Sequence, residues 1–314
     1  MFIGNKNHVD FFKKALENGQ LSHAYCLCGP EGVGKETLVK MIAGKILDIP
    51  DQSLFQNPNF YYFERELDEK TGKQKKEISV SQAREIKEKM TRKAWSAKGQ
   101  ILIVDGVQYL NKEAGNALLK ALEEPAENSY LFLLGDHEKN ILPTILSRCQ
   151  KVIFNPVSIA EITEGLKKEG YEEEIAKVAA AFSNGLPGKA KRLIEDKEFD
   201  EKFKIEIRKW LSMFKMNFFE RTASLENIFS EKDGNKARDI LIKKMDFWLE
   251  LWRELLLFKT KGKTNGLLTE IEMSVLPVKP AQIKDIIDEI AQTQNYLKNN
   301  VQTRLAVEQL LLKF

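Results

Sequence analysis

The chain has 314 residues and a mass of 36.1 kDa, a length typical of about two domains and too great for one small module. Its 49 basic and 46 acidic residues give a formal net charge of +3, which excludes a protein coated with positive charge but allows a local basic face. An apolar fraction of 43% excludes a disordered chain.

The N-terminal residues 1–16 show a helical alternation of apolar and polar residues and lack the apolar core of a signal peptide. No apolar run approaches the ~20 residues that span a membrane. The three cysteines cannot form a paired secreted framework, which favours a reducing compartment. We therefore expect a cytoplasmic protein with no membrane partner.

The first half of the chain alternates strand-like with helix-like segments. Apolar runs predict four short strands, at residues 24–28 (AYCLC), 101–104 (ILIV), 130–134 (YLFLL) and 151–154 (KVIF). Apolar residues at helical spacing predict helices at residues 36–47 and 112–124, the second ending at Pro125. This alternation predicts an α/β domain with a parallel sheet.

The strand signal disappears after residue 156. Residues 158–195 have the pattern of short helices with a break at GLPG (185–188), and residues from 199 to the end are helical throughout. We therefore predict three domains, at residues 1–156, 157–198 and 199–314. The charged stretch 68–77 (DEKTGKQKKE) is expected to form an exposed hairpin or loop.

A G-x-x-x-x-G-K run follows the first strand and opens the first predicted helix of the sheet domain. Its glycines, Gly29, Gly32 and Gly34, would let backbone N–H groups turn inward around phosphate oxygens, at a helix N-terminus that favours anions. Lys35 would reach the β- and γ-phosphates. The run predicts a phosphate-binding loop, with ATP as the cofactor it would take.

Two groups that serve hydrolysis are replaced. The Ser or Thr that would bind Mg²⁺ is Glu36, and Thr37 lies one position late. Asp105 follows an apolar strand and fits the role of organising Mg²⁺, although capping of the next turn is the alternative. Gly106 stands where many ATPases carry a Glu. We interpret the domain as a nucleotidase scaffold without its hydrolytic parts, which would bind Mg²⁺ only together with nucleotide.

The cysteines and histidines do not predict a metal site. The three histidines do not fall at zinc-ligand spacings with the three cysteines, so no zinc is expected. Cys26 and Cys28 alternate along one predicted strand and should share one face of it, where small buried apolar side chains are the favoured role.

Four motifs together resemble the bacterial sliding-clamp loaders of the AAA+ class. They are SHAY at 22–25, AGNALLKALEEP at 114–125, ILPTILSRCQ at 141–150 and NVQTRLAVE at 300–308, so the resemblance spans the chain. Within the family the chain is most similar to the delta-prime type of DNA polymerase III subunit. An active motor subunit of the gamma/tau type is the alternative, and a small P-loop NTPase is a weaker third.

The resemblance implies roles for the three predicted domains and for two basic residues. The domains would be an AAA+ P-loop domain, a small helical lid and an all-α C-terminal collar for oligomerisation. Arg148 matches an arginine finger that acts in trans in a neighbouring subunit's nucleotide site, and a helix-end arginine paired with a carboxylate is the alternative. Lys189 matches a lid residue near the γ-phosphate, although a solvated lysine fits nearly as well. Gly135 and Asp136 replace a polar sensor residue.

The resemblance also implies partners and a function. The chain would be part of a DNA polymerase holoenzyme, would help load the sliding clamp onto primed DNA, and would have little or no ATPase activity of its own. Its partners would be the motor and delta-type subunits, the clamp and primed DNA. Residues 51–66 lack the cysteines of the zinc module that many relatives carry. The basic residues between 84 and 98 interleave with Glu85 and Glu88, which favours a solvated helix face over a phosphate contact.

Overall fold

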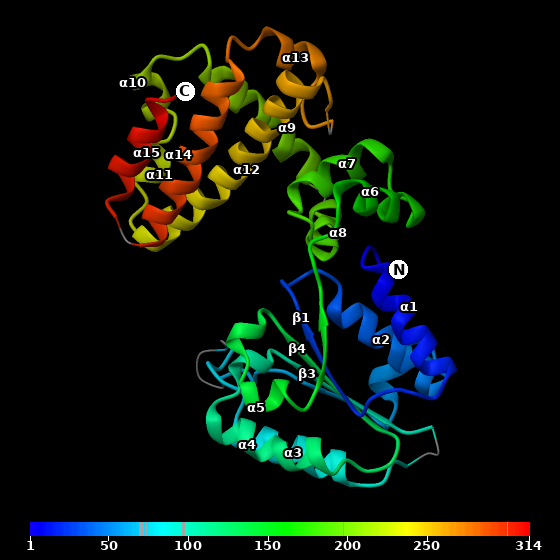
Figure 1. Ribbon diagram of the computed structural model, residues 1–314. Coiled ribbons are helices and arrows are strands. Elements are labelled where there is room, and N and C mark those ends of the chain that lie inside the picture. The colour runs from blue at the N-terminus through cyan, green and yellow to red at the C-terminus, as the bar shows by residue number, and fades with distance from the viewer. Residues whose placement is uncertain (69–71, 73, 96–97, 197, 265, 300) are drawn as a thin grey trace. The chain divides into compact units, whose positions relative to one another are not determined.

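The computed structural model describes residues 1–314 apart from 69–71, 73, 96–97, 197, 265 and 300 (Figure 1). It separates into two compact units. The first comprises residues 1–165 and 185–189, and the second comprises residues 166–184 and 190–314. The three domain boundaries drawn from the sequence stay a prediction.

The first unit is built on a five-stranded sheet in which every pair of neighbouring strands is parallel, in the order β2-β3-β4-β1-β5. The strands are β1 Ala24–Cys28, β2 Phe60–Phe63, β3 Gln100–Asp105, β4 Ser129–Gly135 and β5 Gln150–Ile153. This order places β1 centrally, between β4 and β5. The predicted α/β class with a parallel sheet is confirmed.

The sequence pattern missed one edge strand. β2 is only four residues long, and all four are aromatic (FYYF), so it shows neither clear alternation nor a β-branched run. It pairs with β3, with Phe60 opposite Ile101 and Phe63 opposite Val104. The fifth strand begins one residue earlier than predicted, at Gln150.

Helices cover both faces of this sheet (Figure 1). One core joins alternate strand side chains to α1 Lys6–Glu17 and α2 Lys35–Leu47, and the other joins the remaining ones to α3 Val80–Thr91 and α4 Lys112–Glu123. α4 begins where the Asn111 side chain accepts a hydrogen bond from the Ala114 N–H at 2.9 Å. It ends just before Pro125, as predicted. A four-residue helix, α5 Pro143–Leu146, precedes β5.

The charged stretch 68–77 is described only in part, because residues 69–71 and 73 lie outside the described residues. Around it, Leu67 and Gln74 form an antiparallel bridge, and Lys75 pairs with Glu66 at 2.7 Å. The sequence predicts an exposed hairpin or loop here, and the contacts of the described residues are compatible with a hairpin.

The second unit contains helices alone among its described residues. α6 Ile159–Lys168 and α8 Pro187–Glu195 contribute residues to both units. The others are α7 Glu173–Phe182, α9 Phe199–Met213, α10 Phe218–Ala223, α11 Glu226–Phe229, α12 Gly234–Lys261, α13 Glu270–Val275, α14 Pro280–Lys298 and α15 Thr303–Leu311. Trp210, Trp248 and Trp252 are buried in the core of this unit, where they pack against Phe214 and Phe314. In the described part of the chain, no helix combines the length and apolar character needed to cross a bilayer.

Candidate nucleotide site

The predicted phosphate loop connects the carboxyl end of β1 with the start of α2. Gly32 and Gly34 adopt φ angles of 80° and 107°, which L-residues with side chains rarely adopt. A Cβ atom on Gly29 would lie 2.7 Å from the carbonyl oxygen of Phe154, so the loop backbone packs closely on the segment after β5. The three predicted glycines thus share one tight turn at a helix N-terminus.

Lys35 is folded back onto this turn. Its ammonium donates to the carbonyl oxygen of Gly29 and, at 3.0 Å, to that of Pro30. Burial lowers the pKa of Lys35, and the nearby carboxylates of Asp105 and Asp136 oppose that shift. The charge therefore sits at the loop, where it can meet a phosphate group.

Glu36 and Thr37 are directed to other contacts. The Glu36 carboxylate pairs with the Lys40 ammonium one turn along α2, at 2.6 Å, and that ammonium lies 4.8 Å from the centroid of the Phe55 ring. Thr37 is exposed, and neither Glu36 nor Thr37 lines the pocket beside the loop. The hydroxyl ligand that an ATPase supplies to Mg²⁺ at this point is missing.

Asp105 ends β3 at the same edge of the sheet. Its Oδ2 accepts a hydrogen bond from the Tyr62 hydroxyl at 3.2 Å. Gly106 follows with a φ of 85°, and a Cβ atom there would lie 2.7 Å from the Tyr109 ring. A Glu at position 106 would therefore need both a strained backbone and a displaced Tyr109.

The position expected for a sensor residue is also closed to side chains. Gly135 ends β4, and a Cβ atom there would lie 2.7 Å from Cδ1 of Ile141 and 3.0 Å from Cγ1 of Val107. Asp136 follows, with Oδ2 accepting from the Asn140 side chain at 3.1 Å. A polar side chain at 135 could not enter without repacking its apolar neighbours.

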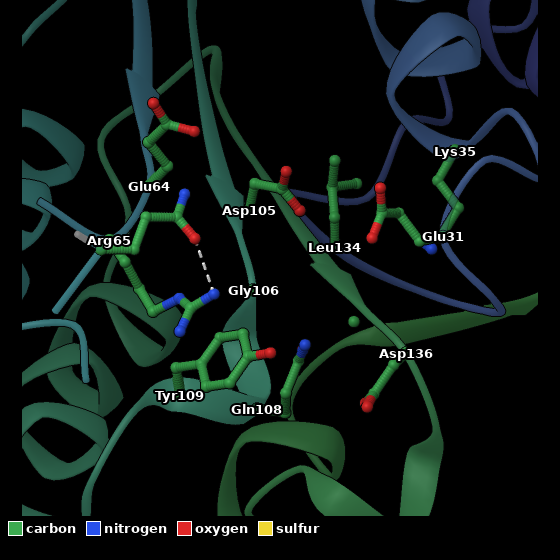
Figure 2. Close-up of a pocket in the computed structure, with 12 residues that line it drawn as sticks. Glu31, Lys35, Glu64, Arg65, Asp105, Gly106, Gln108, Tyr109, Leu134 and Asp136 are labelled. Atoms are coloured by element: carbon green, nitrogen blue, oxygen red, sulfur yellow. Dashed lines mark hydrogen bonds between the residues drawn. The ribbon is translucent and has the colours of Figure 1, made fainter. Parts of the chain in front are cut away.

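A pocket of about 400 Å³ opens between these strand ends (Figure 2). It is lined by four carboxylates and two cations: Glu31, Glu64, Asp105, Asp136, Lys35 and Arg65. The Arg65 guanidinium lies 3.7 Å from the centroid of the Tyr109 ring and donates to Gln74 at 2.8 Å. The loop suits a phosphate group, but the excess of carboxylates disfavours a triphosphate without a cation to neutralise it.

Arg148 lies just after α5. Its Nε and Nη2 both donate to Oε1 of Glu123, at 2.8 and 2.6 Å, and its Nη1 donates to the Thr144 carbonyl at 3.1 Å. The side chain keeps 36% of its surface exposed and does not line the pocket of its own chain. Within one chain the geometry matches the helix-end ion pair, and the role in trans stays a prediction.

Lys189 lies in the first turn of α8, whose start packs on the phosphate loop. The N–H of Gly188 donates to the Gly32 carbonyl at 2.8 Å, and a Cβ atom on Gly188 would lie 3.2 Å from Cα of Gly32. The sequence predicts a break between helices at residues 185–188, but α8 already begins at Pro187. The start of α8, including Lys189, therefore belongs to the first unit, and contact between the Lys189 side chain and a phosphate stays a prediction.

Comparison with known proteins agrees with this arrangement. A family model described as "DNA polymerase III, delta subunit" matches residues 4–158. DNA polymerase III subunit delta' of Haemophilus influenzae is 30% identical over 229 residues, which cover 68% of this chain and 65% of that protein. The delta' subunit of Pseudomonas aeruginosa is 31% identical over 55% of this chain and 56% of its own length. The chain belongs to the clamp-loader AAA+ family.

Membership of the clamp-loader family does not identify the subunit type. A DNA polymerase III subunit gamma of Buchnera aphidicola is 28% identical over 273 residues, which cover 81% of this chain and 73% of that protein. The match to this chain thus covers less than two thirds of the length of each delta' relative, and 73% of the length of the gamma relative. The resemblance drawn from the motifs is confirmed at the level of the family.

Several residues at this site of the clamp-loader protein were not predicted from the sequence. Tyr62, Glu64 and Arg65 lie in or directly after β2, which had not been recognised as a strand. Because the carboxyl ends of neighbouring parallel strands meet at one edge, an aromatic run next to Glu64 and Arg65 was the signal that could have revealed them. Cys26 and Cys28, with sulfur atoms 3.7 Å apart, do share one face as predicted.

We predict that Asp105→Asn stabilises the protein at neutral pH. Burial raises the pKa of Asp105 above its ordinary value of 3.8. A raised pKa means that the folded state favours the protonated acid, so this contribution is present below the unfolded pKa and lost as the pH rises through the folded one. The urea midpoint of Asp105→Asn should exceed that of the parent at pH 7, by less at pH 4.

The exposed Asp10 provides a control, because Asp10→Asn should leave the midpoint nearly unchanged at both pH values. A lower midpoint for Asp105→Asn at pH 7 would show that the ionised carboxylate is stabilising, contrary to this account.

Proposed function

We propose that this chain is a delta-prime-like clamp-loader subunit that has little or no ATPase activity of its own. It would act in the cytoplasm with motor and delta-type subunits and help load the sliding clamp onto primed DNA. Its direct chemical contribution would be Arg148, presented to the nucleotide site of a neighbouring subunit.

The observation that carries this proposal is the contrast between the loop and its surroundings. The loop keeps its glycine conformations and Lys35, which together suit a phosphate group. The two groups that would assist hydrolysis are replaced by Glu36, paired with Lys40, and by Gly106, packed against Tyr109. A fold that keeps the cradle without the hydrolytic groups supports binding or assembly over turnover.

The position of Arg148 supports a role in trans. A guanidinium supplies fixed positive charge in a planar arrangement, which suits the negative charge that develops on a transferring phosphoryl group. Its pair with Glu123 is partly exposed on both sides, and such pairs contribute about 0–1 kcal/mol. Exchanging Glu123 for a neighbour's phosphate would therefore cost little.

The lone chain should release no phosphate from Mg-ATP above the background of a mock purification. Titration with a fluorescent ATP, with and without Mg²⁺, would show separately whether nucleotide binds. Lys35→Ala is the control, because it removes the loop cation and leaves any contaminating ATPase unchanged. If the parent chain released phosphate and Lys35→Ala did not, the proposal would be wrong and the chain would be an active motor subunit.

A motor of the gamma/tau type is the second candidate, favoured by the intact loop geometry and by the extent of the match to a gamma subunit. In that case Glu36 would have to leave Lys40 and act as an unusual metal ligand. Steady turnover by the lone chain, lost in both Lys35→Ala and Glu36→Ala, would support it.

A further inference from the structure

One aromatic side chain of the first unit has no packing role. Trp95 lies between α3 and β3 with 84% of its surface exposed, whereas the other three tryptophans are buried. An indole left in water forgoes the hydrophobic stabilisation that burial of a large apolar side chain would give. Core packing therefore does not explain a tryptophan at this position.

The backbone that carries Trp95 is nevertheless held in place. Its N–H donates to Oδ1 of Asn59 at 2.9 Å, and the side chain of Gln100 donates to the Arg92 carbonyl, also at 2.9 Å. Asn59 and Gln100 are 4% and 2% exposed, so two buried polar side chains fix this segment. Trp95 thus exposes its ring to water while buried side chains hold the backbone of its segment by hydrogen bonds. A side chain held in this way loses little conformational freedom when it binds a partner.

Three basic residues lie close to Trp95 along the chain, at positions 92, 93 and 98. Arg92 pairs with Glu88 at 2.6 Å and Lys98 pairs with Asp48 at 2.9 Å, and all four side chains are more than half exposed. Such pairs are weak and can exchange a carboxylate for another anion. Lys93 is exposed, and no ion pair is recorded for it within the described residues.

We propose that Trp95, with Arg92, Lys93 and Lys98, forms a contact site for single-stranded nucleic acid. A base would stack on the indole, and the basic side chains would pair with the flanking phosphates. An exposed tryptophan can also enter an apolar pocket of a protein partner, but the three basic residues near it in the chain favour a polyanion. The site lies outside the nucleotide pocket, so it does not depend on the proposed function.

Trp95 allows a direct test in the intact chain, because it is the only exposed tryptophan of the four, all of which are described. Titration with oligo(dT) of about 12 nucleotides should quench tryptophan fluorescence to saturation. Stacking is worth about 1–3 kcal/mol per base, so Trp95→Ala should weaken binding of a labelled oligo(dT) by about 5- to 150-fold, while Trp95→Phe should retain most of it. Parallel titrations with oligo(U) and with duplex DNA would show whether the site prefers single-stranded DNA, single-stranded RNA or a duplex.

Two controls separate stacking from general attraction. Phe219→Ala removes an aromatic side chain that is 80% exposed in the second unit, and it should leave affinity unchanged. Lys93→Gln should lower the slope of log K against log salt by about 0.7, the value for one phosphate contact on a single strand, whereas Lys13→Gln on α1 should not. Thermal unfolding of each variant should match that of the parent, because each altered side chain is exposed.

The proposal is overturned if oligo(dT) and oligo(U) give no saturable quenching, or if Trp95→Ala binds them as tightly as the parent. The proposal would also be rejected if duplex and single strands bound with equal affinity and Trp95→Ala did not change it. General electrostatic attraction would then explain the binding. If Trp95→Ala bound oligonucleotides normally but lost binding to purified sliding clamp, the residue would be a protein-docking side chain instead.

Discussion

Arg148→Ala should lower ATP hydrolysis in a mixture with the motor subunit by about 10³–10⁵-fold at the nucleotide site that Arg148 serves, the range known for arginine fingers in trans. The physical reason is loss of a fixed positive charge where the transferring phosphoryl group becomes more negative. Phosphate release by the mixture, compared with that of the motor subunit alone, measures the effect. Nucleotide sites served by other arginine fingers would still hydrolyse ATP. Single-turnover rates are therefore more informative than the total rate of phosphate release.

A lower rate supports the finger only if Arg148→Ala folds as stably as the parent and still assembles with the motor subunit. The Arg148–Glu123 pair is partly exposed, so its loss should alter the free energy of unfolding by no more than about 1 kcal/mol. Arg253→Ala is a control for the loss of such a pair, since Arg253 also pairs with a glutamate at 2.6 Å, on α12. Unchanged single-turnover rates with Arg148→Ala, in a mixture that still co-elutes on gel filtration, would rule out the finger.

Glu123→Ala tests the same idea from the other side. If Glu123 only holds Arg148 before assembly, its removal should leave hydrolysis in the mixture within a few-fold of the parent. A loss as large as that of Arg148→Ala would instead make Glu123 necessary for positioning the guanidinium.

Trp252→Ala should cost the second unit about 3–5 kcal/mol of its free energy of unfolding, the range for removing a large aromatic side chain from a core. Trp252 is fully buried, and its ring centroid lies 5.2 Å from those of Trp210 and Phe314 and 5.4 Å from that of Phe214. Alanine would leave a cavity between three aromatic neighbours. Urea unfolding followed by far-ultraviolet circular dichroism measures the loss.

Trp252→Phe is the matched control. The indole Nε1 of Trp252 is buried and finds no hydrogen-bond acceptor among the described residues, so phenylalanine removes an unsatisfied donor while keeping most of the apolar volume. Its cost should be well under half that of alanine. Equal losses for the two variants would show that the indole nitrogen has a partner that stabilises the fold.

Local sequence patterns predicted most of the sheet domain. The strands Ala24–Cys28 and Gln100–Asp105 and the helix Lys35–Leu47 could be predicted because each pattern reflects burial along the element itself. The glycine spacing predicted the loop because left-handed backbone angles favour glycine wherever they occur. β2 was missed because four aromatic residues fit several local structures, and only pairing with β3 makes them a strand.

The sequence by itself determined that this protein has a parallel α/β domain with a phosphate loop and lacks Ser or Thr after Lys35, since all of these are written in neighbouring residues. Only the tertiary structure decided that Gly188 contacts Gly32, that Arg148 pairs with Glu123, and that Tyr109 closes the space beside Gly106. The first two contacts join residues far apart in the chain, and the third depends on how a turn folds back. Such contacts form because the connections between parallel strands bring the ends of strands and helices together. A local pattern of side chains does not predict which ends will meet.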